Sequence, residues 1–478
     1  MEQIFSRWVT STALFRADAE ALVGFVLAVA VTVHALLRKR RVSVAVGWIG
    51  LAWLSPILGS ALYLLLGINR VYRRARKMRG RPSEATPPAD DDDAVVPETL
   101  WPLDRAIRRI TATPALVGNR VRLYRNGDEA YPDMLAAIRG ARLSVALSSY
   151  IFRDDEAGHE FCDTLAEAKR RGVEVRVIID GIGGGYFRTP AYRRLTAAGV
   201  PAALFMHSAL PWRMPFLNLR NHKKLLIIDG QVGFTGGLNI ASANRVASNP
   251  PHPIRDTHFR FEGPVVDQLA TTFAADWFFA NGENLDGPPW FTNPEPVGAT
   301  VARAVTSGPD ADVQKIEQVV IQALNCARRS VRIATPYFLP DELVTGALTQ
   351  AATRGVSVEV VIPAKGDHRF IDWAMRAHLD PLIRAGVQIY LDTPPFDHTK
   401  AMVIDDIWCF VGSANWDMRS FRLNFELNVE VIDADVAAEI DALIRRKMER
   451  RLTATDLAAR YLPVRLRDAG VRLLLPYL

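Results

Sequence analysis

The chain has 478 residues and a mass of 53.0 kDa, too long for one ordinary core, since a domain takes roughly 150 residues. Hydrophobic residues make up 49% and charged residues 23%, which excludes a chain that is disordered or fibrous as a whole. The cysteines, Cys162, Cys326 and Cys409, are too few and too scattered for a disulfide framework or a CxxC metal site. The net charge of +6 is local, because residues 38–81 hold eleven Lys or Arg and no acid, leaving −5 elsewhere.

Two apolar segments flank part of this basic stretch. Residues 19–37 are almost continuously apolar and are long enough to cross a bilayer core of about 30 Å. A second apolar run covers residues 43–68, and its Pro and Gly residues are tolerated in membrane segments. A cleaved signal peptide is the alternative for the first run, but Arg-Lys-Arg-Arg over 38–41 follows it in place of an AxA-like cleavage site. We therefore expect two N-terminal membrane helices.

The cations beside these segments bear on topology. The connector 38–41 carries four of them, and seven lie between Arg70 and Arg81. If both segments span, these flanks lie on opposite faces, and only one satisfies the positive-inside rule. The larger cluster favours a cytoplasmic body, with the second segment spanning or re-entrant. Residues 1–81 are thus the expected anchor, and residues 82–98, rich in Pro with an acidic run, predict a solvated linker rather than a metal site.

The rest of the chain contains an internal repeat. ARLSVALSSYIFRDD (141–155) is echoed by ARRSVRIATPYFLPD (327–341), and three further blocks recur in the same order. Short β-branched runs alternate with helical stretches, which is typical of an α/β fold with helices covering a sheet. We expect two similar α/β halves, 99–297 and 298–478, related by a pseudo-two-fold axis and sharing one cleft.

A His-x-Lys element occurs once in each half, followed by Asp and Asn at matched spacing. The Asp is seven residues after the His in both copies, and the Asn is seventeen residues after it. A lone His is more often structural than catalytic, but two matched sets are hard to explain by packing alone. The first set is His222, Lys224, Asp229, Gly237 and Asn239, and the second is His398, Lys400, Asp405, Ser413 and Asn415.

These residue types suit chemistry on a phosphate ester. On a strand, residues i and i+2 face the same side, so each His projects together with its Lys. If the halves face each other, two ammonium groups can hold the nonbridging oxygens of a phosphodiester and offset its developing charge. Asn239, Asn415, the Ser413 hydroxyl and the backbone N–H groups of the turn at Gly237 can complete that cradle. One imidazole can attack phosphorus while the other transfers protons, because imidazole titrates near neutrality.

Acidic residues can support the two imidazoles. A nucleophilic His needs its second ring nitrogen held by an acceptor. Glu426, 28 residues after the second His, is a candidate, and Asp256, 34 residues after the first His, has the equivalent position in its half. For the motif residues Asp229 and Asp405, which close their strands, bonding of turn amides is favoured over direct participation in the chemistry.

The duplicated pattern HxK(x)4D followed by G-G/S-x-N resembles the phospholipase D superfamily. Finer features are similar to bacterial cardiolipin synthases: the two N-terminal membrane segments, NLRNHKKLLIIDG (218–230) and GSANWDMRSFRLNFE (412–426). The resemblance implies that His222 attacks one phosphatidylglycerol and expels glycerol, and that a second phosphatidylglycerol then attacks the phosphatidyl-histidine to give cardiolipin. It also implies that His398 is general acid and then base, and that both Lys and both Asn bind phosphate.

The same resemblance bears on cofactors and partners. It implies no metal or other cofactor, and the sequence contains no tight His/Asp/Glu cluster that demands one. The expected partners are the membrane and the anionic lipid phosphatidylglycerol, since polybasic flanks attract anionic lipid by about 1 kcal/mol per cation. A nuclease is disfavoured, because the body is net acidic. A membrane-bound phospholipase D that hydrolyses phospholipids to phosphatidic acid stays an alternative, since water competes for the same intermediate. The sequence does not indicate an oligomeric state.

Overall fold

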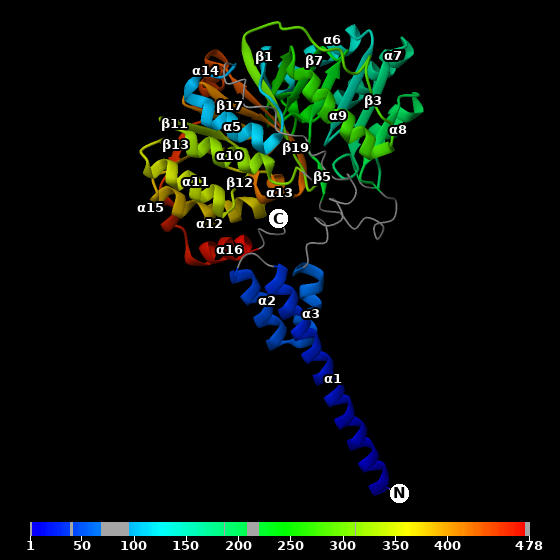
Figure 1. The fold of residues 1–478 in the computed structure, drawn as a ribbon, viewed down its shortest axis with the longest axis vertical. Coiled ribbons are helices and arrows are strands. Elements are labelled where there is room, and N and C mark those ends of the chain that lie inside the picture. The colour runs from blue at the N-terminus through cyan, green and yellow to red at the C-terminus, as the bar shows by residue number, and fades with distance from the viewer. Residues whose placement is uncertain are drawn as a thin grey trace. The chain divides into compact units, whose positions relative to one another are not determined.

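The computed structural model describes residues 2–38, 42–67, 95–185, 187–207, 219–310 and 312–473, with side chains from residue 18 onward except those of residues 65–66. The chain divides into two compact units, residues 1–78 and 79–478 (Figure 1). We describe each unit by itself. Most of the predicted linker, residues 82–98, lies outside the described residues, as does the basic cluster between Arg70 and Arg81.

The N-terminal unit is helical. Within its first helix the segment Asp18–Arg38 has 21 residues and a mean hydropathy of 2.1, so it is long and apolar enough to cross a membrane. No other helix among the described residues meets both criteria. The elements of this unit are α1 (Glu2–Arg38), α2 (Val42–Leu54), α3 (Pro56–Leu62) and a π-helical turn (Tyr63–Gly67).

The second membrane helix, predicted as continuous over 43–68, is broken. The chain leaves α2 at Ser55 and begins α3 with Pro56, whose missing N–H and fixed φ suit the first position of a helix and not its interior. α2 has 13 residues and is therefore about 20 Å long, short of a bilayer core. The second apolar segment is thus helical but interrupted at Ser55, and its spanning or re-entrant course stays a prediction. α1, α2 and the π-helical turn pack together around Ala28, Val31, Ala35, Ala52 and Tyr63.

The C-terminal unit alternates strands and helices twice. The first half contains α5 (Trp101–Thr111), β1 (Leu116–Arg125), α6 (Asn126–Gly140), β2 (Ser144–Ser149), α7 (Glu156–Arg170), β3 (Glu174–Asp180), α8 (Pro190–Ala197), β4 (Ala202–Phe205), β5 (Arg220–Asn221), β6 (Leu225–Ile228), β7 (Val232–Gly236), β8 (Ile254–Arg255), β9 (Thr257–Glu262) and α9 (Val265–Asn281). Short 3-10 turns add Glu98–Leu100, Ser242–Asn244 and Val246–Ser248.

The second half repeats this succession and extends it. Its elements are β10 (Thr300–Ser307), α10 (Lys315–Cys326), β11 (Ser330–Ala334), β12 (Phe338–Leu339), α11 (Glu342–Thr353), β13 (Ser357–Pro363), α12 (Arg369–Arg384), β14 (Gln388–Asp392), β15 (Phe396–Asp397), β16 (Ala401–Ile404), β17 (Trp408–Gly412), β18 (Trp416–Asp417), α13 (Met418–Arg422), β19 (Asn424–Ile432), α14 (Ala434–Arg446), β20 (Arg450–Leu452), α15 (Ala454–Ala458) and α16 (Leu462–Arg472).

One mixed sheet of sixteen strands runs through both halves, in the order β20-β14-β13-β11-β16-β17-β19-β10-β1-β9-β7-β6-β2-β3-β4, with β5 paired to β19. The halves meet where β1 and β10 pair antiparallel. Outward from that contact, β9, β7, β6, β2, β3 and β4 on one side match β19, β17, β16, β11, β13 and β14 on the other. The structure therefore confirms two similar α/β halves, and their pseudo-two-fold axis passes between β1 and β10.

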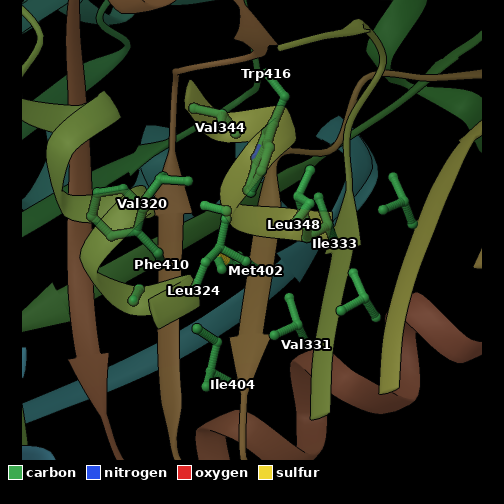
Figure 2. Close-up of a cluster of buried hydrophobic side chains, with 14 of the residues drawn as sticks. Val320, Leu324, Val331, Ile333, Val344, Leu348, Met402, Ile404, Phe410 and Trp416 are labelled. Atoms are coloured by element: carbon green, nitrogen blue, oxygen red, sulfur yellow. The ribbon is translucent and has the colours of Figure 1, made fainter. Parts of the chain in front are cut away.

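Helices cover both faces of the sheet, which is why its inner strands are apolar at successive positions. On β6, Leu225 packs with the core beneath α9 and α14, whereas Leu226 packs with the core beneath α6, α7 and α8. The corresponding core of the second half lies beneath α10 and α11 (Figure 2). Its labelled side chains are Val320, Leu324, Val331, Ile333, Val344, Leu348, Met402, Ile404, Phe410 and Trp416.

The helix α5 precedes β1 in the chain but packs against α10 of the second half. A buried ion cluster reinforces this contact. The guanidinium of Arg303 on β10 lies 2.8 Å from Asp104 of α5 and 2.6 Å from Glu430 of β19, and all three side chains are at most 1% exposed. The indole N–H of Trp408 donates a further bond to Glu430 at 2.7 Å. The cluster ties α5 to the centre of the shared sheet.

Exchange of Arg303 for Ala would leave the buried carboxylate of Glu430 without its counter-charge, whereas Asp104 would keep its ion pair with Arg108 at 3.2 Å. We expect Arg303→Ala to destabilise the fold by about 3–5 kcal/mol, because an unpaired buried charge costs far more than a surface one. The control is Arg120→Ala on β1, whose side chain is 63% exposed beside Glu262 and should cost less than about 1 kcal/mol. Thermal unfolding of both full-length variants in detergent checks this, and equal midpoints would contradict it.

Candidate active site

The two His-x-Lys segments lie where the halves meet. His222 follows β5, which pairs in parallel with β19 of the second half. His398 follows β15, which pairs in parallel with β8 of the first half. The backbone N–H of His222 donates to the Phe425 carbonyl at 2.9 Å, and that of His398 donates to the Arg255 carbonyl at 2.7 Å. Each histidine is therefore held in place by a strand of the opposite half.

The two imidazoles face each other across one cavity. Their ring centroids are 6.5 Å apart, and their planes are inclined by 84°. The cavity has a volume of about 460 Å³ and is lined by side chains of both halves, as the repeat predicts for a shared cleft. Tyr150 lies edge-on to His222 at 4.7 Å, and Tyr337 lies edge-on to His398 at 6.2 Å. Both histidines are less than one-tenth exposed.

Each imidazole is bonded to a carboxylate from the other half. Nδ1 of His222 lies 3.0 Å from both carboxylate oxygens of Glu426, and Nδ1 of His398 lies 2.8 Å from Oδ2 of Asp256. Both carboxylates are buried. A carboxylate at Nδ1 selects the tautomer that donates from this nitrogen and leaves Nε2 free. The two acids predicted as acceptors are thus bonded to the imidazoles. Each acid is paired with the histidine of the other half.

The positions that follow each His-x-Lys motif hold these carboxylates. The Ser413 hydroxyl donates to Glu426 at 2.5 Å, and the side-chain amide of Asn424 donates to the same carboxylate at 3.0 Å. At the matching position Gly237 leaves room for Asp256, since a Cβ there would lie 2.1 Å from Oδ1. Ser413 and Gly237, which the sequence placed in a phosphate cradle, do not line the cavity. Their contacts are with the acceptors of the imidazoles.

Burial keeps both imidazoles neutral. It lowers the pKa of His222 to about 4, against the opposing effect of Glu426, and the charges of Lys224 and Lys400 lower it further. Burial also lowers the pKa of His398, and the Lys400 charge adds to this. Burial acts to raise the pKa of Glu426, but the adjacent His222 and its other partners lower it overall. Near pH 7 the site therefore holds neutral imidazoles, each with a free Nε2.

The two lysines lie beside the histidines, are 2% exposed and do not themselves line the cavity. Nζ of Lys224 donates to the His222 carbonyl at 2.7 Å and lies 5.1 Å from the centre of the Tyr150 ring. Nζ of Lys400 donates to the carbonyl of His398. Burial lowers the pKa of Lys224 to about 7, with a contribution from the Lys400 charge, and lowers the pKa of Lys400 to about 8. An anion in the cavity would restore both charges.

Asn239 and Asn415 line the cavity at matched positions. Oδ1 of Asn239 accepts the backbone N–H of Ile151 at 3.2 Å. Oδ1 of Asn415 is buried and has no hydrogen-bond partner among the described residues. The carbonyl oxygen of the Asn415 side chain is thus available to a hydrogen-bond donor. Within the described part of the chain, no group of three or more His, Cys, Asp or Glu side chains is arranged to hold a metal ion.

Asp229 and Asp405 lie outside the cavity lining. The Asp229 carboxylate accepts backbone N–H groups of residues 142–144 at 2.7–3.2 Å. The Asp405 carboxylate accepts those of residues 328–330 at 2.7–2.9 Å. These bonds tie the ends of β6 and β16 to the starts of β2 and β11. These contacts are the bonds to backbone amides that the sequence favoured for the two acids. None of them joins either acid to an imidazole.

The cavity also contains residues that motif analysis missed. Tyr150 and Tyr337 stand in the repeated blocks 141–155 and 327–341, but one position out of register, since Tyr150 aligns with Pro336 and Tyr337 with Ile151, so the repeat does not pair them. Arg220 and Arg419 also line the cavity. Neither arginine has an arginine at the matching position of the other half, so a comparison of the two copies does not find them.

Comparison with known proteins identifies the family. The family model described as "Cardiolipin synthase, PLD-like domain" matches residues 134–277 and 320–448, and each stretch includes one His-x-Lys element. Cardiolipin synthase A of Pseudomonas aeruginosa is 34% identical over 461 residues, which covers 94% of this chain and 92% of that protein. The major cardiolipin synthase ClsA of Bacillus subtilis is 32% identical over 472 residues, which covers 95% of this chain and 98% of that protein.

A solved structure shares the fold. Phosphatidylserine synthase of Haemophilus influenzae Rd KW20 superposes with a TM-score of 0.60 at 15% identity, covering 79% of this chain and 100% of that one. At this identity the likeness concerns the arrangement of helices and strands alone. The family match covers more than half of the chain and includes both halves of the cavity. The chain belongs to the family of cardiolipin synthases with a phospholipase D-like domain.

Proposed function

We propose that the protein is a phosphatidyltransferase that makes cardiolipin and glycerol from two molecules of phosphatidylglycerol. One observation carries this proposal: two neutral imidazoles from opposite halves face each other across one cavity, each bonded at Nδ1 to a buried carboxylate. Such a pair offers one nucleophile and one proton-transfer group for a single phosphorus atom. Relatives named cardiolipin synthase that align over nearly the whole chain support the same activity.

In the first step, Nε2 of His222 attacks the phosphorus of a phosphatidylglycerol. A P–N bond forms and the P–O bond to the glycerol headgroup breaks, with the leaving oxygen taking a proton from Nε2 of His398. The anionic phosphate raises the pKa of His398 on binding, so this imidazole can arrive protonated. Glu426, which meets Nδ1 of His222 with both oxygens, stabilises the positive charge that develops on the nucleophile.

In the second step, the primary hydroxyl of another phosphatidylglycerol replaces the departed glycerol. Nε2 of His398 takes the hydroxyl proton, the oxygen attacks phosphorus, and the P–N bond to His222 breaks. Two phosphatidylglycerol molecules thus yield one cardiolipin and one glycerol, and the enzyme returns to its starting protonation. Asp256 keeps His398 in the tautomer that both proton transfers need.

The remaining residues have supporting roles in this proposal. Lys224 and Lys400 offset the charge on the nonbridging oxygens, and Asn239 and Asn415 donate to the same phosphate from the cavity wall. Asp229 and Asp405 shape the strands that carry the histidines. The positioning residues are Asp256, Glu426, Ser413 and Gly237.

We also propose that the enzyme works at the bacterial cell membrane, where its lipid substrate lies. α1 has the length and hydropathy of an anchor. The seven cations between Arg70 and Arg81 favour the cytoplasmic side for the catalytic body by the positive-inside rule. The same cations attract the anionic headgroups of phosphatidylglycerol.

The lipid product tests the activity. Purified full-length protein with vesicles of phosphatidylglycerol alone should release glycerol and form cardiolipin in equal amounts, measured by mass spectrometry and a glycerol assay. His222→Ala and His398→Ala should each lower turnover by about 10³-fold or more, because each removes a reacting group. Phosphatidic acid as the sole product would instead establish a membrane-bound phospholipase D. Turnover retained in either variant would refute the two-histidine mechanism.

The lysines predict a loss of activity at alkaline pH. Because the pKa values of Lys224 and Lys400 are lowered to about 7 and about 8, their charges are present at lower pH and are lost as pH rises through this range. We expect kcat/KM to fall between pH 7 and 9, and kcat to fall less, since bound phosphate raises both pKa values. In Lys224→Arg, which stays charged, the fall should begin at higher pH. A kcat/KM profile that is flat to pH 9 would contradict the proposal that these lysines balance the charge of the bound phosphate.

Gly237 predicts an effect transmitted through Asp256. A Cβ at this position would displace the carboxylate that holds His398, so Gly237→Ala should lower kcat by about 10²-fold, as small misplacements of reacting groups do. The control is Gly346→Ala on α11, where a Cβ meets nothing within 4 Å. Both variants should keep their unfolding midpoints. Full activity in Gly237→Ala would show that the Asp256 bond is dispensable.

A further inference from the structure

The active-site cavity is symmetric at its centre and asymmetric in charge around it. His, Lys and Asn occur in both halves at equal spacing, but two arginines do not. Arg220 stands two residues before the first histidine, and the matching position in the second half is Phe396. Arg419 stands four residues after the second asparagine, and its match in the first half is Ala243. The cavity therefore has two extra cations without symmetric counterparts.

The two arginines come from opposite halves and line the same cavity as the histidines. Arg220 lies on β5, and Arg419 lies on α13 just beyond β18. Burial raises the pKa of Tyr150 overall, although the charge of Arg220 acts to lower it, and the Tyr150 ring packs against His222. Both arginines are half-buried. Burial, followed by the charge of Arg220, lowers the pKa of Arg419, so the two guanidinium groups interact through space.

Two acids line the cavity, Asp367 and Asp417, and Asp367 accepts the hydroxyl of Tyr337 at 2.7 Å. Asp417 stands two residues before Arg419, and its carboxylate accepts the backbone N–H of Ser420 at 2.7 Å, which caps α13. Burial, above all other causes, raises the pKa of Asp417 to about 6. Burial and the Arg220 charge lower the pKa of Arg419 overall, although the charges of this carboxylate and of Asp180 act to raise it. Two half-buried arginines beside Asp417 favour an anionic ligand.

The proposed reaction brings two phosphates into one cavity. The donor phosphate occupies the space between the histidines, where Lys224 and Lys400 balance its charge. The acceptor lipid keeps its own phosphate intact, and the product has two phosphates joined through one glycerol. The second phosphate therefore needs a counter-charge away from the cavity centre. Arginine suits this need, because its planar guanidinium binds two phosphate oxygens at once.

We propose that Arg220 and Arg419 bind the intact phosphate of the acceptor lipid, so that the intermediate reacts with an anionic lipid alcohol in preference to water or a neutral alcohol. This assignment rests on the proposed function and names the residues that select its second substrate. It gives the two anionic ligands separate partners, with Lys224 and Lys400 for the phosphate that reacts and the arginine pair for the one that does not.

Two reactions of the same intermediate test the proposal. Full-length Arg220→Gln and Arg419→Gln are assayed in mixed micelles of phosphatidylglycerol for cardiolipin formation, and separately for exchange of labelled glycerol into phosphatidylglycerol. Exchange uses a neutral acceptor, so it does not need the second phosphate site. The ratio of cardiolipin formation to exchange should fall about tenfold in each variant, the usual effect of losing one charged hydrogen bond. Arg419→Lys, which keeps the charge, should lose less.

The matched control is Arg122→Gln, which removes an exposed arginine of β1 that does not line this cavity. Its ratio should equal that of the parent protein. Equal losses of both reactions in Arg220→Gln and Arg419→Gln would overturn the proposal, because the arginines would then serve the donor phosphate or the fold. A parent protein that exchanges glycerol but forms no cardiolipin would refute the proposed function itself, before any variant is compared.

Discussion

The candidate active site depends on hydrogen bonds that cross between the two halves of the C-terminal unit. Glu426 belongs to the second half and holds His222 of the first, while Asp256 belongs to the first half and holds His398 of the second. Neither His222 nor His398 is bonded at Nδ1 to a carboxylate of its own half. The parallel pairs β5–β19 and β8–β15 bring each histidine to the opposite carboxylate. This explains why one continuous sheet joins the halves, because relative movement would separate imidazole from carboxylate in both pairs.

Burial gives the centre its chemical character. The low-dielectric surroundings lower the pKa of both imidazoles and of both lysines. Burial therefore disfavours the protonated forms of these four side chains. An anion bound beside them would raise their pKa values and favour the protonated forms again. Binding a phosphodiester would therefore switch the protonation of the site in the direction that proton transfer requires. The same burial makes Glu426 and Asp256 effective partners, since hydrogen bonds to charge strengthen where water is excluded.

Duplication accounts for the centre of the cavity but not for its surroundings. Paired positions supply equal groups where the chemistry is symmetric, namely the histidines, lysines and asparagines. Gly237 and Ser413 occupy the same position of the motif in the two halves but contact different acids. The glycine leaves space for Asp256, and the serine donates a hydrogen bond to the longer Glu426. Arg220 and Arg419 lack symmetric partners, as expected if the two lipids of the proposed reaction have different roles.

Local patterns in the sequence sufficed for the α/β repeat, for the apolar segment within α1 and for both His-x-Lys elements, because strand periodicity, hydropathy and motif spacing are properties of neighbouring residues. They did not locate the break at Ser55, where α2 ends and Pro56 begins α3 inside an apolar run. They could name Glu426 and Asp256 as acceptors but not pair them, since these contacts span 204 and 142 residues. The pairing and the arginine positions follow from strands exchanged between halves, a long-range arrangement that no local pattern records.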